Sequence, residues 1–330
     1  MRRPTKKVGR PGTKPEDPLR IAVLVPCFNE EKAVAQVIAG FRAALPAAAI
    51  YVYDNNSTDG TVVAARAAGA IVRSEAKQGK GHVVRRMFAD VEADVYVLVD
   101  GDATYDAPSA PAMISDLIAH NRDMVVAARI SQEDAAYRRG HRAGNRLLTG
   151  FVASVFGSRF TDILSGYRVF SRRFVKSFPV LSGGFEIETE LTVHALELDL
   201  RVGEIATPYY ARPVGSQSKL NTWRDGFRIL WTIMRLYRSE RPLNFFSGIA
   251  AFLAIASVGL AIPVIVTYLE IGLVPRLPTA VLATGMMLAA FLAFAAGLIL
   301  DTVTRGRREV KLLAYLAQRG LEERRKTPRS

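Results

Sequence analysis

Two aspartates that directly follow an apolar run are the residues of this sequence best suited to chemistry. Residues 95–107 are VYVLVDGDATYDA, so apolar and β-branched residues lead into Asp100, Gly101 and Asp102. In an extended segment, side chains two residues apart emerge on the same side. Carboxylates placed in this way suit Mg²⁺ or Mn²⁺, which bind through one or two carboxylates while substrate phosphates complete the shell. The alternative is a polar turn that merely ends a strand, and we prefer that interpretation for Asp106.

Polar side chains also follow two earlier apolar runs. The segment VPCFNE (25–30) supplies Asn29 and Glu30, and YDNNSTDGT (53–61) supplies Asp54 ahead of a helical pattern. The second segment alone is ordinary turn and helix-capping chemistry, although a carboxylate there can accept hydrogen bonds from a nucleobase or a ribose. The sequence has neither G-x-G-x-x-G after the first run nor G-x-x-x-x-G-K-[ST], so neither a dinucleotide fold nor a P-loop is indicated.

The elements that must position these loops alternate between strand and helix. Strands are predicted at 21–25, 49–54, 71–73 and 95–100, and helices at 30–45, 60–70 and 79–91. This alternation indicates a doubly wound α/β sheet. Ligands bind such sheets beyond the carboxyl ends of the strands. All three polar loops lie at such ends, so we expect one crevice to receive them.

Two long uncharged segments follow the α/β pattern. They cover residues 243–269 and 277–300, and seven residues separate them. Each exceeds the roughly 20 apolar residues that cross a bilayer, which predicts a transmembrane helical hairpin over 243–301. The mean hydropathy of +0.13 is also high for a soluble protein. A buried helix pair in a soluble protein is the alternative.

The net charge of +13 is concentrated beside these segments. Residues 1–20 carry seven basic and two acidic groups, residues 201–242 eight and three, and residues 302–330 nine and three. By the positive-inside rule we expect a multi-pass protein of the plasma (inner) membrane with the α/β domain and both termini cytoplasmic. Such clusters also suit anionic membrane lipid. Nucleic acid is the competing partner, but no basic motif interleaved with aromatic residues supports it.

Two amphipathic helices are predicted between the sheet and the hairpin. Residues 145–157 place their apolar side chains on one face, which fits either a core-packed helix or a helix at the membrane interface. Residues 222–242 interleave arginines with an aromatic stripe and lead directly into the first apolar segment, which favours a helix lying in the membrane interface. The predicted organisation is a disordered basic arm (1–20), an α/β domain (21–222), a juxtamembrane helix (223–242), the hairpin (243–301) and a basic cytoplasmic tail (302–330).

Five short motifs, in order, resemble those of the family 2 inverting glycosyltransferases with the GT-A fold. They are PCFNE, DNNSTDGT, GKG, DGD and SGYRVF. Within that family the chain is most similar to the polyprenyl-phosphate glycosyltransferases, the group of the dolichol-phosphate mannose synthases and bactoprenol-phosphate glucosyltransferases. The resemblance implies a GT-A mixed sheet and a Mg²⁺ or Mn²⁺ ion. It also implies transfer of a hexose, with inversion, from a nucleotide-sugar donor to a polyprenyl phosphate. Tetramers occur among similar bacterial proteins, which leaves a homo-oligomer open.

The resemblance also implies roles for individual residues. Pro26, Asn29 and Glu30 would line the nucleotide pocket, Asp54 would contact the base, and Asp100 and Asp102 would be the metal-binding D-x-D. Lys80 of GKG and Arg212, Ser218 and Lys219 of the segment ARPVGSQSKL would bind the donor diphosphate or the acceptor. The segments AARI and HRAGNRLL match those that present arginines to the lipid phosphate, which points to Arg129 and Arg142. A solvated surface charge is the alternative for each lone arginine.

Two positions depart from the family pattern. Thr104 stands where dolichol-type relatives often carry a glutamine metal ligand, which leaves the third protein ligand open. The segment GFEIETEL lacks the adjacent Glu-Asp pair that acts as general base in soluble members. A phosphate acceptor has a second pKa of about 6 and is already largely dianionic at neutral pH, so it needs positioning and not a base. Glu188 would orient the sugar, lie near the metal or cap the following helix.

Two other functions compete with this interpretation. One is a glycosyltransferase that acts on another lipid or on a polysaccharide, and the other is a membrane scaffold without activity. Processive synthases of this family carry Q-x-x-R-W and more apolar spans, a pattern that this sequence lacks. The intact Asp100 and Asp102 argue against the scaffold. For the donor, UDP-glucose, another UDP-hexose or uronic acid, and GDP-mannose all fit.

Overall fold

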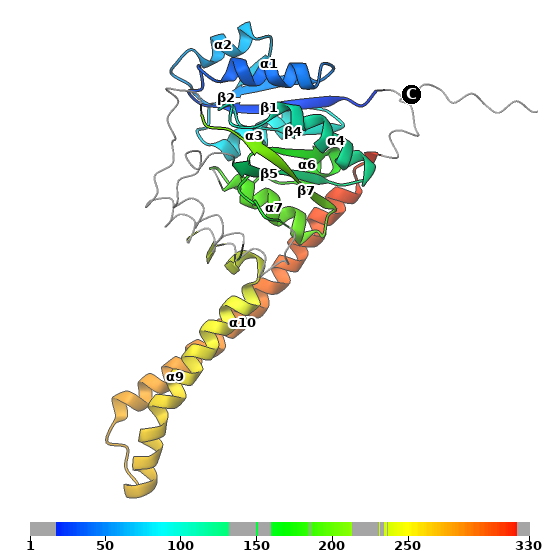
Figure 1. The fold of residues 1–330 in the computed structure, drawn as a ribbon. Coiled ribbons are helices and arrows are strands. Elements are labelled where there is room, and N and C mark those ends of the chain that lie inside the picture. Colours follow the sequence, from blue (N-terminus) through cyan, green and yellow to red (C-terminus); the bar gives the residue numbers. More distant parts are fainter. Residues whose placement is uncertain are drawn as a thin grey trace, which may run out of the picture.

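A mixed seven-stranded sheet is the centre of the α/β domain (Figure 1). The computed structural model describes residues 18–131, 150, 160–184, 186–212, 231, 234–235 and 237–321. The strands lie in the order β3-β2-β1-β4-β6-β5-β7. Their bounds are β1 Ile21–Cys27, β2 Ala49–Asp54, β3 Ile71–Ser74, β4 Val95–Leu98, β5 Met124–Ser131, β6 Arg168–Ser171 and β7 Val202–Tyr209. β6 is antiparallel to both of its neighbours, and the remaining pairs are parallel. The predicted doubly wound sheet is therefore confirmed, and it contains both parallel and antiparallel strand pairs.

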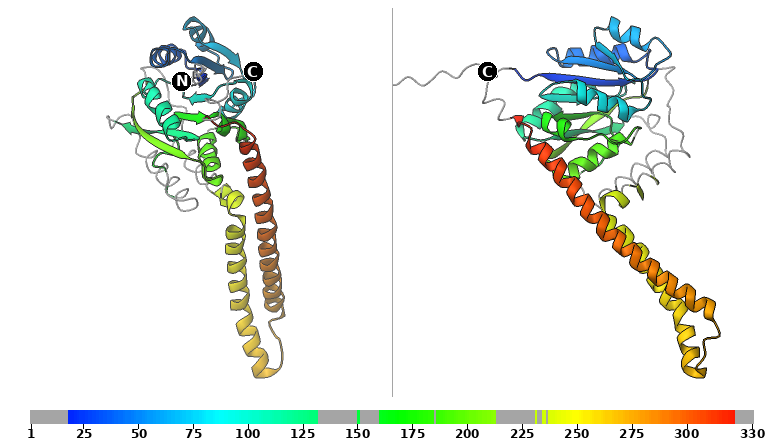
Figure 2. Two further views of the ribbon diagram at one scale, coloured as in Figure 1. Left: turned by 90° about the vertical axis from the view of Figure 1, so that its right-hand side faces the viewer. Right: turned by 180° about the vertical axis from the view of Figure 1, so that it is seen from behind.

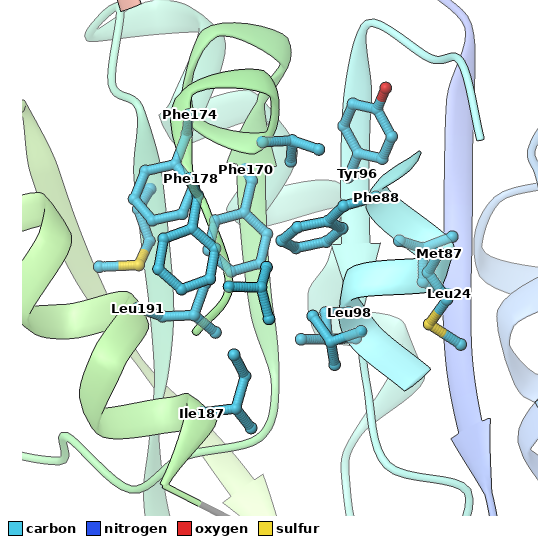
Figure 3. Close-up of a cluster of buried hydrophobic side chains, with 14 of the residues drawn as sticks. Leu24, Met87, Phe88, Tyr96, Leu98, Phe170, Phe174, Phe178, Ile187 and Leu191 are labelled. Carbon is cyan, nitrogen blue, oxygen red and sulfur yellow. The ribbon is translucent and has the colours of Figure 1, made fainter. Parts of the chain in front are cut away.

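Helices cover both faces of this sheet because successive strand side chains point to opposite faces. In β1, Leu24 packs into one apolar core while Val23 and Val25 pack into the other. The first core is completed by α3 (Lys80–Asp90), α6 (Arg172–Ser177) and α7 (Ile187–Glu197), and the second by α1 (Val34–Ala44), α2 (Thr61–Ala67), the 3₁₀ turn η1 (Ala107–Ser109) and α4 (Ala110–Ala119). Figure 3 shows the first core, where the rings of Phe88, Phe170 and Phe178 lie together.

Two long antiparallel helices project from the α/β domain (Figure 2). They are α9 (Pro242–Ile271) and α10 (Leu277–Leu316), and both are long and apolar enough to cross a membrane. They meet through small side chains such as Ala250 and Gly297, and the Ser257 hydroxyl donates to the Ala283 carbonyl at 2.7 Å. Only 17% of each apolar span is buried, so the alternative of a buried soluble helix pair is not supported.

The second of these helices continues well beyond the apolar segment. Residues 302–316, predicted as the start of a cytoplasmic tail, are helical and reach the α/β domain (Figure 1). Lys311 Nζ lies 2.6 Å from Glu197 Oε2 of α7, and the Tyr315 hydroxyl donates to Asp123 Oδ2 at 3.0 Å. The boundary predicted at residue 301 is therefore no structural break, because one helix joins the hairpin to the sheet.

Three predicted segments lie largely outside the described residues. Residues 1–17 of the basic arm are among them, as is the helix predicted at 145–157 apart from residue 150. Of the predicted juxtamembrane helix (223–242), residues 231, 234–235 and 237–242 are described, and all of these except Arg241 are helical. The side chains of Trp231 and Met234 are exposed there.

Candidate active site

The three polar loops meet at one edge of the sheet, as expected. Strand pairing places Cys27 of β1 opposite Asp54 of β2. The backbone N–H of Asn29 donates to the Ser57 hydroxyl at 2.9 Å, and the Asn29 side-chain oxygen accepts from the Thr58 N–H at 2.8 Å. Asn29 has φ 53°, a left-handed conformation that asparagine tolerates better than most residues. Its side chain therefore ties the first two loops together.

Glu30 and Pro26, on either side of this asparagine in the sequence, also lie at the edge formed by β1 and β2. The backbone N–H of Glu30 donates to the Thr61 hydroxyl at 2.8 Å, which joins the first loop to the start of α2. Pro26 is half-buried within β1, opposite Tyr53. The residues predicted to line a nucleotide pocket thus lie at the edge formed by β1 and β2.

Asp54 carries a buried oxygen that lacks a hydrogen bond within the described part of the chain. The residue is 6% exposed, and its Oδ2 accepts from the Ser57 N–H at 3.2 Å. Its Oδ1 is buried and makes no hydrogen bond within the described part of the chain. Burying an unsatisfied acceptor costs about 1–3 kcal/mol. A ligand N–H group at this position would remove that penalty, so the geometry suits a hydrogen-bond donor such as a nucleobase.

Asn55 is a structural residue of this edge that the sequence interpretation missed. Its side-chain amide donates to the Glu75 and Lys77 carbonyls, both at 2.9 Å, and its oxygen accepts from the Gly79 N–H at 2.7 Å. These bonds fix the segment that leads into α3. Nothing in the motif DNNST distinguishes this asparagine from its neighbour, because its partners lie 20 or more residues away.

The two glycines of GKG let α3 approach another segment closely. A Cβ on Gly79 would collide with the Gly183 carbonyl, and one on Gly81 would collide with the Ser182 carbonyl. Gly79 also has φ 129°, which disfavours any side chain. The intervening Lys80 is thereby brought to the first turn of α7, so the motif is explained by backbone packing around one lysine.

The Lys80 ammonium lies between two carboxylates, those of Asp100 and Glu188. The side chains of Lys80 and Glu188 are only 10% and 7% exposed. Burial alone would lower the pKa of Lys80, but the two negative charges outweigh it and raise that pKa well above its usual value. Glu188 lies in the first turn of α7 and directs its carboxylate to this lysine.

Asp102 is held by two partners. Its Oδ1 accepts from the Thr104 hydroxyl at 2.6 Å, and its Oδ2 lies 2.7 Å from an Arg212 guanidinium nitrogen. Thr104 occupies the position at which relatives often carry a glutamine metal ligand. Here its hydroxyl orients the Asp102 carboxylate. Burial and the negative charge of Asp100 raise the pKa of Asp102 above its ordinary value. The turn itself packs closely, since a Cβ on Gly101 would lie 2.6 Å from Cys27 Sγ.

The donor set fits a hard divalent cation. Asp100 and Asp102 supply carboxylate oxygens on one turn, and the repulsion that raises the pKa of Asp102 is what a cation would relieve. Among the described residues there is no group of three or more His, Cys, Asp or Glu side chains that could hold a metal. Mg²⁺ and Mn²⁺ commonly bind through one or two carboxylates together with substrate phosphates and water. Two aspartates are sufficient for such a site.

Arg129 is not a solvated surface charge. Its Nε and a terminal nitrogen donate to the two oxygens of Asp162 at 2.6 and 2.8 Å, and its guanidinium lies 5.4 Å from the Tyr209 ring centroid. Burial alone would raise the pKa of Asp162, but the paired bonds from Arg129 lower it. Any phosphate that this arginine contacts would have to share it with Asp162. The other predicted residues, Arg142, Ser218 and Lys219, lie outside the described residues.

The motif SGYRVF supplies a buried arginine to which the sequence interpretation gave no role. Arg168 is fully buried and donates to the Ile163 carbonyl at 2.6 Å, the Ser165 carbonyl at 2.9 Å and the Thr192 hydroxyl at 2.8 Å. The Thr192 hydroxyl in turn donates to the backbone carbonyl of Glu188 at 3.0 Å. The arginine therefore ties the loop before β6 to the helix that carries Glu188.

The same loop closes over Asp100. The Gly166 N–H donates to the Tyr105 hydroxyl at 2.8 Å, and a Cβ on Gly166 would collide with Asp100 Oδ2. Burial raises the pKa of Tyr105, so its hydroxyl stays protonated. Asp106, interpreted as a turn residue, accepts from the Ser109 hydroxyl at 2.6 Å at the start of η1. It also accepts from the Tyr210 hydroxyl at 3.1 Å.

Three relatives match between 48% and 74% of this chain. Glycosyltransferase AglJ of Haloferax volcanii is 35% identical over 247 residues, which cover 74% of this chain and 81% of AglJ. A dolichyl-phosphate hexose transferase of the same organism is 27% identical over 221 residues, 67% of this chain and 95% of that protein. An uncharacterised protein of Shigella flexneri is 58% identical over 157 residues, 48% of this chain and 96% of that protein.

Solved structures share the fold at low identity. Glucosyl-3-phosphoglycerate synthase from Mycobacterium tuberculosis in complex with UDP is 21% identical, with a TM-score of 0.55 over 69% of this chain and 85% of that one. The same enzyme with Mn²⁺, UDP and phosphoglyceric acid gives a TM-score of 0.54 at 20% identity, over 66% and 78%. The family model described as Glycosyl transferase family 2 matches residues 22–178, which include β1 to β4, the D-x-D turn and the SGYRVF motif. The α/β domain therefore has the GT-A architecture, and the chain belongs to glycosyltransferase family 2.

Proposed function

We propose that this glycosyltransferase transfers a hexose from a nucleotide diphosphate sugar to a polyprenyl phosphate at the cytoplasmic face of the membrane, with inversion. The observation that carries the proposal is that α10 runs without a break from the apolar helix pair to the α/β domain, where Lys311 and Tyr315 contact Glu197 and Asp123. A donor site joined in this way to two candidate membrane spans suits an acceptor that resides in lipid. The similarity to a dolichyl-phosphate hexose transferase supports the same acceptor class.

Donor binding is assigned to the edge formed by β1, β2 and β4. Asp54 accepts a hydrogen bond from the base through its buried oxygen, while Pro26, Asn29 and Glu30 line the nucleotide pocket. Asp100 and Asp102 hold Mg²⁺ or Mn²⁺, which when bound withdraws charge from the leaving diphosphate. Arg212, together with Ser218 and Lys219, adds positive charge and hydrogen-bond donors for the diphosphate or the acceptor.

Acceptor chemistry follows from the charge balance around Glu188. Its carboxylate pairs with the Lys80 ammonium, and no second acid is adjacent to it in the sequence. A phosphate dianion brings no proton that must be removed, so it requires orientation rather than a base. Arg129 and Arg142 supply that orientation, because paired guanidinium hydrogen bonds match the geometry of a phosphate.

The proposed setting is the plasma (inner) membrane. The hairpin of α9 and α10 spans it, and the α/β domain lies on the cytoplasmic side with both termini. The basic residues on either side of the hairpin favour this orientation.

The decisive experiment is a transfer assay with purified full-length protein in detergent. Labelled UDP-glucose, a second UDP-hexose, a UDP-uronic acid and GDP-mannose are each offered with a short polyprenyl phosphate, in the presence of Mg²⁺ or Mn²⁺ or of EDTA. We expect metal-dependent transfer from one donor, its loss in Asp102→Asn and its retention in Asp106→Asn. Wild-type rates in Asp102→Asn would reject the metal assignment. Transfer only to a neutral lipid or glycan would favour the other acceptor class, and no transfer from any donor would favour the scaffold.

A further inference from the structure

A polar cavity lies at the end of the sheet opposite to the candidate active site. Its volume is about 130 Å³. Asp123, which precedes β5, and Ser171, the last residue of β6, line it. Arg129 and Arg168, by contrast, lie toward the other ends of these two strands. The wall is completed by one residue near the end of α10 and by three residues that follow the helix, so the cavity is formed jointly by the sheet and the C-terminal end of this helix. These residues are Tyr315, Arg319, Gly320 and Leu321.

The lining of this cavity is strongly basic. It contains five arginines, Arg122, Arg172, Arg173, Arg201 and Arg319, and the single carboxylate of Asp123. Both carboxylate oxygens already accept hydrogen bonds, from the Ser171 hydroxyl at 2.9 Å and from the Tyr315 hydroxyl at 3.0 Å. The positive charge of the cavity is therefore not balanced within its own wall.

The arginines differ in whether their side chains already form an ion pair with a carboxylate. Arg172 pairs with Glu92, and Arg122 lies 2.9 Å from Asp116. The side chains of Arg201 and Arg319 are exposed and make no hydrogen bond or ion pair to another residue that the structure describes. These two guanidinium groups consequently have donors to offer to a ligand.

The wall is also held in place before any ligand arrives. The Arg173 Nε donates to the Gln318 carbonyl at 2.8 Å, and its guanidinium lies 5.5 Å from the Tyr315 ring centroid. Placing several like charges around one small space is unfavourable unless an anion compensates them. Arginines arranged in this way recognise phosphate, because the planar guanidinium offers two parallel N–H groups to two oxygens.

We propose that this cavity binds the phosphate group of a small soluble molecule, chiefly through Arg201 and Arg319. The volume of about 130 Å³ exceeds the ~30 Å³ that one water occupies in the liquid, which leaves room for a four-oxygen anion. Arg122 and Arg201 also line a wider hollow of about 470 Å³, which can take the rest of a phosphorylated molecule. The bound anion would link the end of α10 to the sheet.

The position along α10 favours a soluble source over a lipid headgroup. The apolar segment ends at Asp301, and Tyr315 follows 14 residues later. At 1.5 Å per residue this is about 21 Å along the helix, whereas the headgroup layer on each side of the hydrocarbon core is roughly 5–8 Å thick. A phosphate in the cavity therefore comes from solution.

The test is calorimetric binding of inorganic phosphate and of pyrophosphate to the full-length protein in detergent, at constant ionic strength. EDTA is present so that the D-x-D site cannot retain pyrophosphate through a metal. We expect saturable binding and a rise in the unfolding temperature. In Arg201→Ala/Arg319→Ala the affinity should fall at least tenfold. The matched control, Arg66→Ala/Lys77→Ala, removes two exposed positive charges elsewhere and should bind as the wild type does.

Three results would overturn the proposal. They are no saturable binding at millimolar phosphate, equal loss of affinity in the two double variants, and an affinity that is unchanged in Arg201→Ala/Arg319→Ala. A further arm adds phosphatidylglycerol vesicles at the same total phosphate. A rise in the unfolding temperature with vesicles but not with soluble phosphate would assign the site to a lipid headgroup and reject the soluble source. None of these readouts depends on sugar transfer, so they are independent of the proposed activity.

Discussion

Lys80 and Glu188 form a buried ion pair although they lie 108 residues apart in the sequence. The pair joins the first residue of α3 to the first turn of α7, and Asp100 contacts the same ammonium group. One lysine thus compensates a carboxylate of the D-x-D turn and the only acid of α7 that points at it. Its removal should affect both stability and the binding of a divalent cation.

The first prediction concerns that lysine. Lys80→Met should lower the free energy of unfolding by about 3 kcal/mol, because it leaves a buried carboxylate without its partner. Lys80→Met/Glu188→Gln should lose less than the sum of the single variants, with a coupling of about 1–3 kcal/mol. Denaturant unfolding in detergent measures both. The control is Lys77→Met, an exposed lysine on the preceding segment. Additive losses would contradict the pairing.

The second prediction concerns the glycine that lies against the D-x-D turn. Gly166→Ala should reduce sugar transfer by about a hundredfold, because its Cβ must displace the Asp100 carboxylate and small misplacements in active sites have effects of that size. Gly306→Ala, whose Cβ would meet no atom within 4 Å, is the matched control and should keep its activity. Initial rates and circular dichroism of both proteins test this. Full activity in Gly166→Ala would show that Asp100 tolerates displacement.

The third prediction concerns the buried oxygen of Asp54. Asp54→Asn removes the charge but keeps the shape, and it should weaken binding of the nucleoside diphosphate by roughly 10- to 100-fold, the loss of one charged hydrogen bond of about 1.5–3 kcal/mol. Titration calorimetry with UDP and GDP measures it and also distinguishes the donor nucleotide. Asp106→Asn should bind as the wild type does. If Asp54→Asn bound the nucleotide as tightly as the wild type does, Asp54 would not be part of the nucleotide pocket.

The fourth prediction concerns pH and His194. Burial, and next the nearby charge of Lys311, lower the pKa of this histidine to about 3, against about 6.5 in the unfolded chain. Between these values the unfolded state binds a proton that the folded state does not, so stability falls as the pH drops below about 6.5, by up to about 1.4 kcal/mol per unit.

A variant tests this dependence. His194→Gln should show a shallower loss of stability between pH 7 and 5, measured by thermal unfolding, although its stability at pH 7 can differ from that of the wild type. His120→Gln replaces a histidine with a side chain 61% exposed and should keep the wild-type slope. Identical slopes in all three proteins would mean that another group controls acid stability.

The sequence predicted what local patterns encode. Apolar runs located β1 to β4, and the polar residues after them placed Asn29, Asp54 and Asp102 at one edge, because parallel strands share their carboxyl ends. One helix start was less accurate. The predicted helix 30–45 begins at Val34, because the loop after β1 uses its own backbone to hold Thr61.

The remaining features depend on partners that are distant in sequence. The insertion of β6 between β4 and β5 is decided by tertiary packing. So is the burial of Arg168, whose acceptors come from the preceding loop and from α7. Lys80 was implied only as a donor-binding residue, and its contact with Glu188 required the backbone approach that the GKG glycines permit. Patterns of 3.6 or two residues do not report such contacts.

The uninterrupted course of α10 has a consequence for how substrates meet. In the proposed membrane setting, a single helix that crosses the bilayer and then packs on the α/β domain works as a spacer of fixed length. In the proposed setting the nucleotide sugar arrives from three dimensions while the lipid acceptor arrives by lateral diffusion in two. The helix keeps their meeting point at one height above the bilayer. Helical phase is fixed as well, because each residue added to α10 would turn Lys311 and Tyr315 by about 100° away from their partners in the α/β domain. Under the proposed function, the edge that carries the D-x-D turn thereby stays at a constant height and orientation relative to the plane in which the lipid acceptor moves.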